Sequence, residues 1–244
     1  MKKKSAVVIG VGPVKGLGAA LCCKFASEGY HVFIAGRTPE KIEEVAVHIR
    51  AEGGSADTVC LDAGDESAVI RLFDEAFNER DDLQPPDLVV FNAGNNKKID
   101  FLNLTTEEAE SFWRTGCLAG LITGREAVKR MLPLGKGSIL FTGASSSLRG
   151  KPGFVHFSSA KAGLRMLSQA MAREFGPQGI HVAHVILDGV IDGDRLQHSP
   201  ATSGIPTENL LNINAMADNY WFLHMQDSST WTQELDLRPS VEPF

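Results

Sequence analysis

A glycine-rich turn near the start of the chain could hold the phosphates of a nucleotide. The turn joins the apolar run 6–10 to a predicted helix, and it carries Gly10, Gly12, Gly16 and Gly18. Glycines let a turn tighten, and they let the N–H groups at a helix start approach a pyrophosphate, whose charge the helix dipole favours. We therefore predict a dinucleotide site at Gly12, Gly16, Leu17 and Gly18, with a purely structural turn as the alternative.

Two basic residues indicate which dinucleotide this site would prefer. The second predicted strand, 31–36, is followed by Arg37, and no acidic residue is placed there to accept hydrogen bonds from a ribose 2′-hydroxyl. An arginine at this position suits a 2′-phosphate, and Lys15 adds a second cation in the turn. Two cations without a carboxylate predict NADP(H) rather than NAD(H).

The histidines and cysteines do not suggest a metal site. His181 and His184 lie on one predicted strand, where an odd separation directs their side chains to opposite faces. The sequence contains neither an HExxH nor a CxxC spacing. We therefore predict no metal.

Short apolar runs that alternate with amphipathic segments must position these residues. Runs such as 88–91 and 181–187 are apolar almost throughout, as expected of parallel strands covered on both faces. Helix starts are marked by Pro39 after Thr38, and by Thr105 with Glu108 three residues later. We predict an α/β fold with a doubly wound parallel sheet of the Rossmann type, in which residues 1–244 form a single domain. The remaining predicted elements are 16–29, 39–53, 57–61, 65–80, 106–131, 137–142, 155–175, and a last helix and edge strand around 220–222 and 234–239.

Composition excludes several classes of protein. The chain has 244 residues, a formal net charge of −6 and 43% hydrophobic residues, which describes a globular protein rather than a disordered or collagen-like one. The acidic balance argues against a nucleic-acid partner, and no apolar run approaches the roughly 18 residues of a membrane span. The four cysteines are expected to be reduced thiols, and the apolar run after the basic start is too short for a signal peptide. These features predict a cytoplasmic protein that binds neither nucleic acid nor membrane.

The segment 193–209 differs from the rest because it is polar and rich in helix breakers. It follows the carboxyl end of a predicted strand, where open α/β sheets bind their ligands. We interpret it as a substrate lid, and an inert connection is the alternative.

The chain also resembles the short-chain dehydrogenase/reductase family over nearly its whole length. Gly12-x-x-x-Gly16-x-Gly18 is similar to the family's TGxxxGxG motif, and Asn92-Ala93-Gly94 is similar to its NNAG motif. The run 159–182 resembles the family's active-site helix and the strand after it. The resemblance implies that the cofactor also contacts Asp62 and Ala63 on its adenine side, and Asn92, Ala93, Gly94, Lys161, Gly189 and Ile191.

Three of the four positions that carry the family's catalytic residues hold other side chains here. The family has a tyrosine four residues before its lysine and a serine thirteen before the tyrosine. Counted back from Lys161, these positions hold Phe157 and Ala144. The asparagine position holds Cys117, and Asp188 replaces the proline that usually follows the sixth strand. This pattern indicates a divergent branch in which Lys161 alone of the four remains.

The missing tyrosine leaves the proton donor open. In the family's mechanism the tyrosine protonates the carbonyl oxygen while NADPH delivers hydride. Losing a general acid costs about 10²–10⁴ in rate, so we expect electrophilic carbonyl substrates that need little acid assistance. Lys161 or a water that it holds is our first choice of donor, and Ser158 and His156 are alternatives. His156 could equally be a half-exposed residue at the helix start, and we expect Cys117 to be a packed small residue rather than a nucleophile.

Two hypotheses for function remain. The chain reduces a small, activated carbonyl compound with NADPH, or it is a non-catalytic protein that binds NADP(H) or acts as a scaffold. The resemblance also implies a homodimer or homotetramer formed through the predicted helices 106–131 and 155–175.

Overall fold

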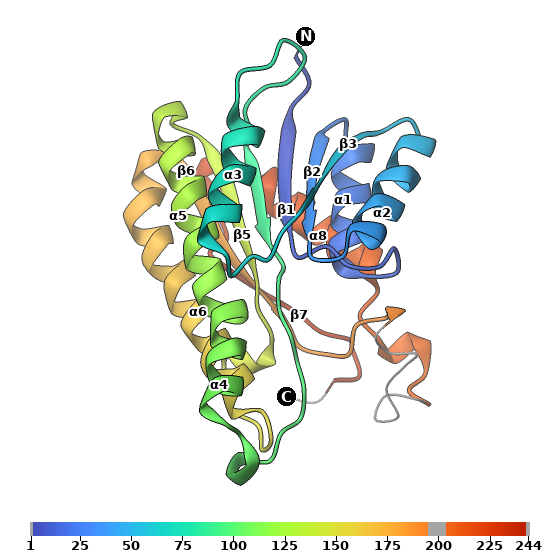
Figure 1. The fold of residues 1–244 in the computed structure, drawn as a ribbon, viewed down its shortest axis with the longest axis vertical. Coiled ribbons are helices and arrows are strands. Elements are labelled where there is room, and N and C mark those ends of the chain that lie inside the picture. Colours follow the sequence, from blue (N-terminus) through green and yellow to red (C-terminus); the bar gives the residue numbers. More distant parts are fainter. Residues whose placement is uncertain (1, 195–203, 243–244) are drawn as a thin grey trace.

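Seven parallel strands form one twisted sheet in the computed structural model, which describes residues 2–194 and 204–242 (Figure 1). The strand order is β3-β2-β1-β4-β5-β6-β7, and every neighbouring pair is parallel. Most strands are buried throughout because helices cover both faces of the sheet, as their apolar runs predict. The strands are β1 (Ser5–Ile9), β2 (His31–Gly36), β3 (Ser55–Cys60), β4 (Leu88–Phe91), β5 (Gly137–Thr142), β6 (Ile180–Leu187) and β7 (Glu234–Leu237).

Helices pack on each face and divide the core into two apolar clusters. One cluster joins α1 (Leu17–Ser27), α2 (Pro39–Ala51) and α8 (Ile213–His224) to the sheet. The other joins α3 (Glu66–Phe77), α5 (Ala119–Met131) and α6 (Val155–Phe175) to the opposite face, and α4 (Thr106–Trp113) packs beside α6 (Figure 1). The predicted doubly wound sheet in a single domain is confirmed.

The predicted helix-start signals are confirmed at one helix and only in part at another. Thr105 and Glu108 form the predicted capping box, in which each side chain bonds to the other residue's backbone N–H. Pro39 begins α2 as predicted, but Thr38 makes no side-chain cap there. The predicted single helix 106–131 is wrong in one respect, because a π-helical turn at 114–118 separates α4 from α5.

The order of the strands puts the topological switch point, where open α/β sheets bind ligands, at the carboxyl ends of β1 and β4. The chain runs outward from β1 to β2 and β3, and then returns to β4 on the other side of β1. Crossovers on the two sides of this point therefore lie on opposite faces of the sheet, which leaves room for a ligand between their loops. The predicted nucleotide turn and the Asn92 segment follow these two strands.

The predicted lid lies partly outside the described residues. Of the segment 193–209, the structure describes 193–194 and 204–209, and the last three of these form a short 3₁₀ turn. In the described ranges, none of the helices has the length and apolar character needed to cross a membrane.

Candidate functional site

The glycine-rich turn brings backbone segments into close contact. Gly10 has a φ of +95°, in the left-handed region that favours glycine. A Cβ at Gly18 would lie 2.9 Å from the carbonyl oxygen of Gly10, so a side chain there would push α1 away from the turn. Gly12 has open space around its missing Cβ, and α1 begins after Gly16 without a side-chain cap or an acidic residue in its first turn. The first N–H groups of α1, starting at Leu17, are therefore left for an anion.

The two cations predicted to select the nucleotide lie at the ends of adjacent strands. Lys15 is exposed in the turn after β1, and Arg37 is exposed immediately after β2. The carbonyl oxygen of Lys15 accepts a hydrogen bond from the N–H of Asp194 (3.0 Å), so the described start of the predicted lid lies against the turn. This edge of the sheet presents two positive side chains to solvent beside the turn.

The segment Asn92–Gly94 connects the glycine turn to Lys161. The side-chain amide of Asn92 donates a hydrogen bond to the carbonyl oxygen of Gly10 (3.0 Å), and Ala93 is buried beside it. A Cβ at Gly94 would lie 3.3 Å from Lys161 Nζ, so the lysine lies against the backbone there. The structure therefore brings together the glycine motif, the Asn-Ala-Gly motif and the predicted catalytic lysine.

Asp62 and Ala63 extend the same edge beyond β3. The N–H of Leu61 donates to the carbonyl oxygen of Gly36 (2.9 Å), which keeps this segment beside the end of β2. Asp62 is exposed and its Oδ1 accepts a hydrogen bond from the N–H of Gly64 (2.8 Å), whereas Ala63 is buried. Asp62 is thus oriented by its own loop and keeps its carboxylate accessible.

Lys161 is buried at the centre of the site. Its Nζ donates a hydrogen bond to the carbonyl oxygen of Thr142 at the end of β5 (2.8 Å). Burial lowers the pKa of Lys161 to about 8, because an ammonium group is poorly solvated there, and the nearby Cys117 opposes this shift. At pH 7 most of the Lys161 side chains are therefore protonated, and a minority are neutral.

Neither Ala144 nor Phe157 has a side chain that could donate a proton beside Lys161. The ring centroid of Phe157 lies 6.0 Å from Lys161 Nζ, one helical turn away on α6. Ala144 follows β5 and is partly buried. Cys117 lies in the π-helical turn between α4 and α5, where a Cβ at Gly163 would lie 2.8 Å from its Sγ. Burial raises the pKa of the Cys117 thiol, which agrees with a packed residue rather than a nucleophile.

The two alternative donors lie in different surroundings. His156 is buried, with its ring centroid 4.2 Å from that of Phe112, and its Nε2 donates to the carbonyl oxygen of Lys97 (3.0 Å). The interpretation of His156 as a half-exposed residue is therefore wrong, because α4 packs over it. Ser158 is also buried, and its Oγ has no hydrogen-bond partner among the described residues.

A buried polar network supports the backbone beneath Ala144. Ser147 Oγ accepts a hydrogen bond from the N–H of Ala144 (3.2 Å) and lies 3.3 Å from His184 Nε2, while His184 Nδ1 lies 3.1 Å from a carboxylate oxygen of Glu234. Arg165 binds both oxygens of Glu234. Burial lowers the pKa of His184 to about 4, so its ring is neutral at pH 7, donates to Glu234 and accepts from Ser147.

The residues that follow β6 form another side of the candidate site. Asp188 is buried and accepts bonds from Arg149 Nη2 to both of its carboxylate oxygens (2.9 Å each). Gly189 lies against the ring of Pro239, where a Cβ would come within 2.7 Å. Ile191 pairs with Leu211 through the backbone. The predicted cofactor residues Gly189 and Ile191 thus belong to a segment that is fixed from two sides.

Sequence reasoning missed several of these residues. Tyr220 is fully buried, and its hydroxyl lies 2.8 Å from Oγ1 of Thr142, the residue whose carbonyl oxygen accepts the hydrogen bond from Lys161. The partners His184 and Glu234 are paired opposite one another in the β6–β7 register, which no local pattern reveals. Among the described residues, no group of three potential ligands could hold a metal ion.

These features define a nucleotide-binding α/β protein with a buried lysine at its switch point. The family model for short chain dehydrogenases matches residues 4–202. The chain belongs to the short-chain dehydrogenase/reductase family. Members of this family are oxidoreductases that bind a nicotinamide cofactor, either NAD or NADP, and a small-molecule substrate.

Individual relatives agree with this assignment. An uncharacterized short-chain type dehydrogenase/reductase, y4mP, from Sinorhizobium fredii is 28% identical over 91% of this chain and 90% of its own length. Gluconate 5-dehydrogenase from Gluconobacter oxydans is 26% identical over 70% of this chain and 66% of its own length. The crystal structure of a short-chain dehydrogenase from Rhodopseudomonas palustris is 36% identical, with a TM-score of 0.81 over 97% of this chain and 98% of that chain.

Proposed function

We propose that this chain reduces a small, activated carbonyl compound with NADPH. The observation that carries the proposal is the meeting of the glycine turn, Asn92–Gly94 and Lys161 at one sheet edge. The open space at Gly12 and the uncapped start of α1 fit a pyrophosphate. NADPH, when bound, supplies hydride.

The preference for NADP(H) over NAD(H) rests on charge. Lys15 and Arg37 are exposed at neighbouring strand ends, where a 2′-phosphate would gain charge-assisted hydrogen bonds. Asp62 is exposed after β3 and would face the adenine side, with Ala63 packed beneath it.

The proposed donor is Lys161. Phe157 and Ala144, which we place at the family's tyrosine and serine positions, have no proton to give. A pKa of about 8 leaves most of the Lys161 amines protonated at pH 7, and a group with such a pKa can donate to a carbonyl oxygen near neutral pH. Without the usual tyrosine and serine, the substrates that react should be those whose carbonyl is already electrophilic.

A second candidate function is binding without catalysis. The same apolar positions, Ala144 and Phe157, favour it, because a site that only holds NADP(H) needs the glycine turn and Lys161 but no acid.

In either case, exposed apolar residues on α4, α5 and α6 support a homodimer or homotetramer: Trp113, Leu121 and Met166. We place the protein in the cytoplasm on the basis of its composition.

One experiment separates the two functions. NADPH and NADH are titrated by fluorescence, and NADPH oxidation is then followed with dicarbonyls, halogenated ketones and quinones. We expect NADPH to bind more tightly than NADH by about tenfold to a hundredfold, and Arg37→Ala to remove most of this difference. Arg71→Ala, on α3, is the matched control.

The outcomes are distinct. Turnover by the wild type that is lost in Lys161→Ala supports the reductase. Tight binding without turnover by any of these compounds supports the non-catalytic function. Failure to bind either nucleotide would contradict both, and a preference for NADH would contradict the roles of Lys15 and Arg37.

A further inference from the structure

The hydrogen bond that holds Lys161 uses a carbonyl group at the end of β5 that extends beyond β4. The pairing of β5 with β4 ends one residue before Thr142, whereas its pairing with β6 includes Thr142. The N–H of Gly143 donates to the carbonyl oxygen of Val185 on β6 (2.7 Å). Because successive backbone groups of a strand alternate in direction, the Thr142 carbonyl faces the other side, past the end of β4. It is therefore available to accept a hydrogen bond from Lys161.

The side chain of Thr142 lies on the opposite face of the sheet from Lys161. Leu140, two residues earlier, packs in the apolar cluster of α1, α2 and α8, and residues two apart in a strand share a face. On that face Thr142 Oγ1 lies 2.8 Å from the hydroxyl of Tyr220 on α8. Lys161 lies on α6, which packs against the other face. Thr142 therefore links helices on the two faces through the end of one strand.

The hydroxyl of Tyr220 has one hydrogen-bond partner among the described residues, and that partner is Thr142. The Tyr220 side chain is fully buried, and burial raises the pKa of its phenol well above the ordinary value, so the hydroxyl stays protonated near neutral pH. A phenylalanine would fill the same apolar space without the cost of burying a hydroxyl. The hydrogen bond to Thr142 therefore accounts for the oxygen.

The ammonium group of Lys161 depends on the Thr142 carbonyl for its charge. In the described part of the chain, no carboxylate forms an ion pair with Lys161. Cys117, in the π-helical turn before α5, and His184, on β6, are titratable groups within reach of its charge. Burial raises the pKa of Cys117 and lowers that of His184 to about 4, so both are neutral around pH 7. The carbonyl that accepts from Lys161 is then the group that stabilises its charged form.

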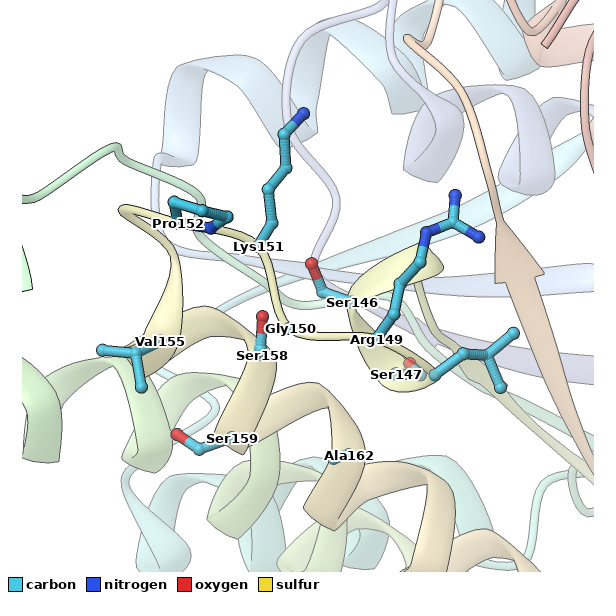
Figure 2. Close-up of a pocket in the computed structure, with 11 residues that line it drawn as sticks. Ser146, Ser147, Arg149, Gly150, Lys151, Pro152, Val155, Ser158, Ser159 and Ala162 are labelled. Carbon is cyan, nitrogen blue, oxygen red and sulfur yellow. The ribbon is translucent and has the colours of Figure 1, made fainter. Parts of the chain in front are cut away.

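Burial keeps these contacts away from solvent. Thr142, Lys161 and Tyr220 are 6%, 4% and 0% exposed. The cavity of about 460 Å³ between the loop after β5 and the first turns of α6 is lined by other residues of these segments, such as Ser146 and Ser158 (Figure 2). Loss of the Tyr220 hydroxyl would therefore leave Thr142 Oγ1 without a partner, at a cost in free energy.

We propose that Tyr220 is a positioning residue for Lys161 and acts through Thr142. This inference rests on the proposed reductase function, because it concerns the group that would donate the proton. The Tyr220 hydroxyl fixes the side chain of Thr142 on one face of the sheet, which fixes where the Thr142 carbonyl holds the amine on the other. The ring of Trp221 packs against that of Phe25 on α1, with centroids 6.2 Å apart. The same contact therefore ties Lys161 to the helix that begins at the nucleotide turn.

Titration of Lys161 tests this role without turnover. Lysine labelled at Cε is incorporated, and the Lys161 resonance, identified by its loss in Lys161→Arg, is followed by NMR against pH. In Tyr220→Phe the midpoint should move to lower pH by about 0.5–1 pH unit, because the charged form loses part of its hydrogen bond. Thr142→Val should give the same shift, whereas Thr142→Ser keeps the hydroxyl and should titrate as the wild type does. Tyr30→Phe is the matched control, since it removes a buried hydroxyl that bonds to His224 in the same apolar cluster.

Turnover provides a second readout. With an activated carbonyl compound and saturating NADPH, kcat of Tyr220→Phe should fall about tenfold at pH 8 with little change in KM, because a displaced amine affects proton transfer more than binding. If no compound oxidises NADPH, the proposed function fails, and the titration still decides the role of Tyr220. An unchanged titration in Tyr220→Phe, or an equal shift in Tyr30→Phe, would overturn the assignment. If Tyr220→Phe does not fold, Thr142→Val against Thr142→Ser makes the same comparison, and equal titration of these two would overturn it.

Discussion

The half of the molecule that would hold the nucleotide and the half that would perform the reaction are built in different ways. At the ends of β1 and β4, close backbone contacts decide the geometry: Gly18 lies against Gly10, and Asn92 bonds to the Gly10 carbonyl. At the end of β5, the expected reacting positions hold Ala144 and Phe157, and the polar groups lie beneath them in the Ser147–His184–Glu234 network.

If Ala144 and Phe157 occupy the reacting positions, as we propose, this difference teaches that a backbone framework persists while the side chains at those positions change. Glycines that touch backbone cannot be replaced without moving whole elements. By contrast, Ala144 and Phe157 are only partly buried. Lys161 belongs to both halves, since it lies against Gly94 and bonds to Thr142.

The strongest test of this comparison restores the expected acid. The double variant Ala144→Ser with Phe157→Tyr should raise the rate on unactivated ketones by about 10²–10⁴, because the tyrosine would supply a proton next to Lys161. NADPH oxidation measures the gain, with Phe154→Tyr, at the cap of α6, as a control for an added hydroxyl. No gain in a folded double variant would show that the two halves differ by more than these side chains.

Replacing a glycine of the turn tests the other half. Gly18→Val should lower the melting temperature and weaken NADPH binding by at least about a hundredfold, because its side chain would meet the Gly10 carbonyl oxygen and Val11. Gly12→Ala should keep the wild-type melting temperature, since open space surrounds its Cβ, and yet weaken binding where the pyrophosphate would lie. Equal losses of stability in the two variants would contradict the distinction.

The buried network predicts how stability depends on pH. The pKa of His184 is about 4 in the folded chain, against 6.5 for an unperturbed histidine. The unfolded chain therefore takes up a proton first as the pH falls, so the free energy of unfolding should decrease from about pH 6.5 to pH 4. The share of His184 in this decrease is about 3 kcal/mol. Denaturant unfolding at several pH values measures it.

The variant His184→Gln should remove this part of the pH dependence and lower the stability at pH 7 by about 1–3 kcal/mol. His48→Gln, on the exposed side of α2, is the control for loss of a histidine. An unchanged slope in His184→Gln would show that the network does not hold His184 neutral.

The smallest expected effect concerns the proton donor. If Lys161 donates the proton, the rate with activated carbonyls should fall about tenfold per pH unit above pH 8, because the protonated fraction falls as the pH rises past the pKa of the group. Stopped-flow measurements at saturating NADPH would follow this change. A rate that stays constant to pH 10 would point to a donor other than Lys161.

Much of the fold could be predicted because the signals were local or periodic. The apolar runs 88–91 and 181–187 and the Thr105–Glu108 capping box depend on neighbouring residues, and the structure contains all three. The burial of His156 was missed because it results from the packing of α4 against α6, and no local pattern marked the π-helical turn at Cys117.

By itself, the sequence determined the seven-stranded order of elements, the family, and the spacing that brings a glycine turn and a buried lysine to one sheet edge. The order of elements follows from residue type and periodicity along the chain, whereas the family and the place of Lys161 in the site come from the resemblance of its motifs to that family. Only the tertiary structure decided which distant residues meet: Glu234 with His184, Tyr220 with Thr142, and Arg149 with Asp188. The register of neighbouring strands and the packing of loops from distant parts of the chain set these pairs. Neither is encoded in any short stretch of residues.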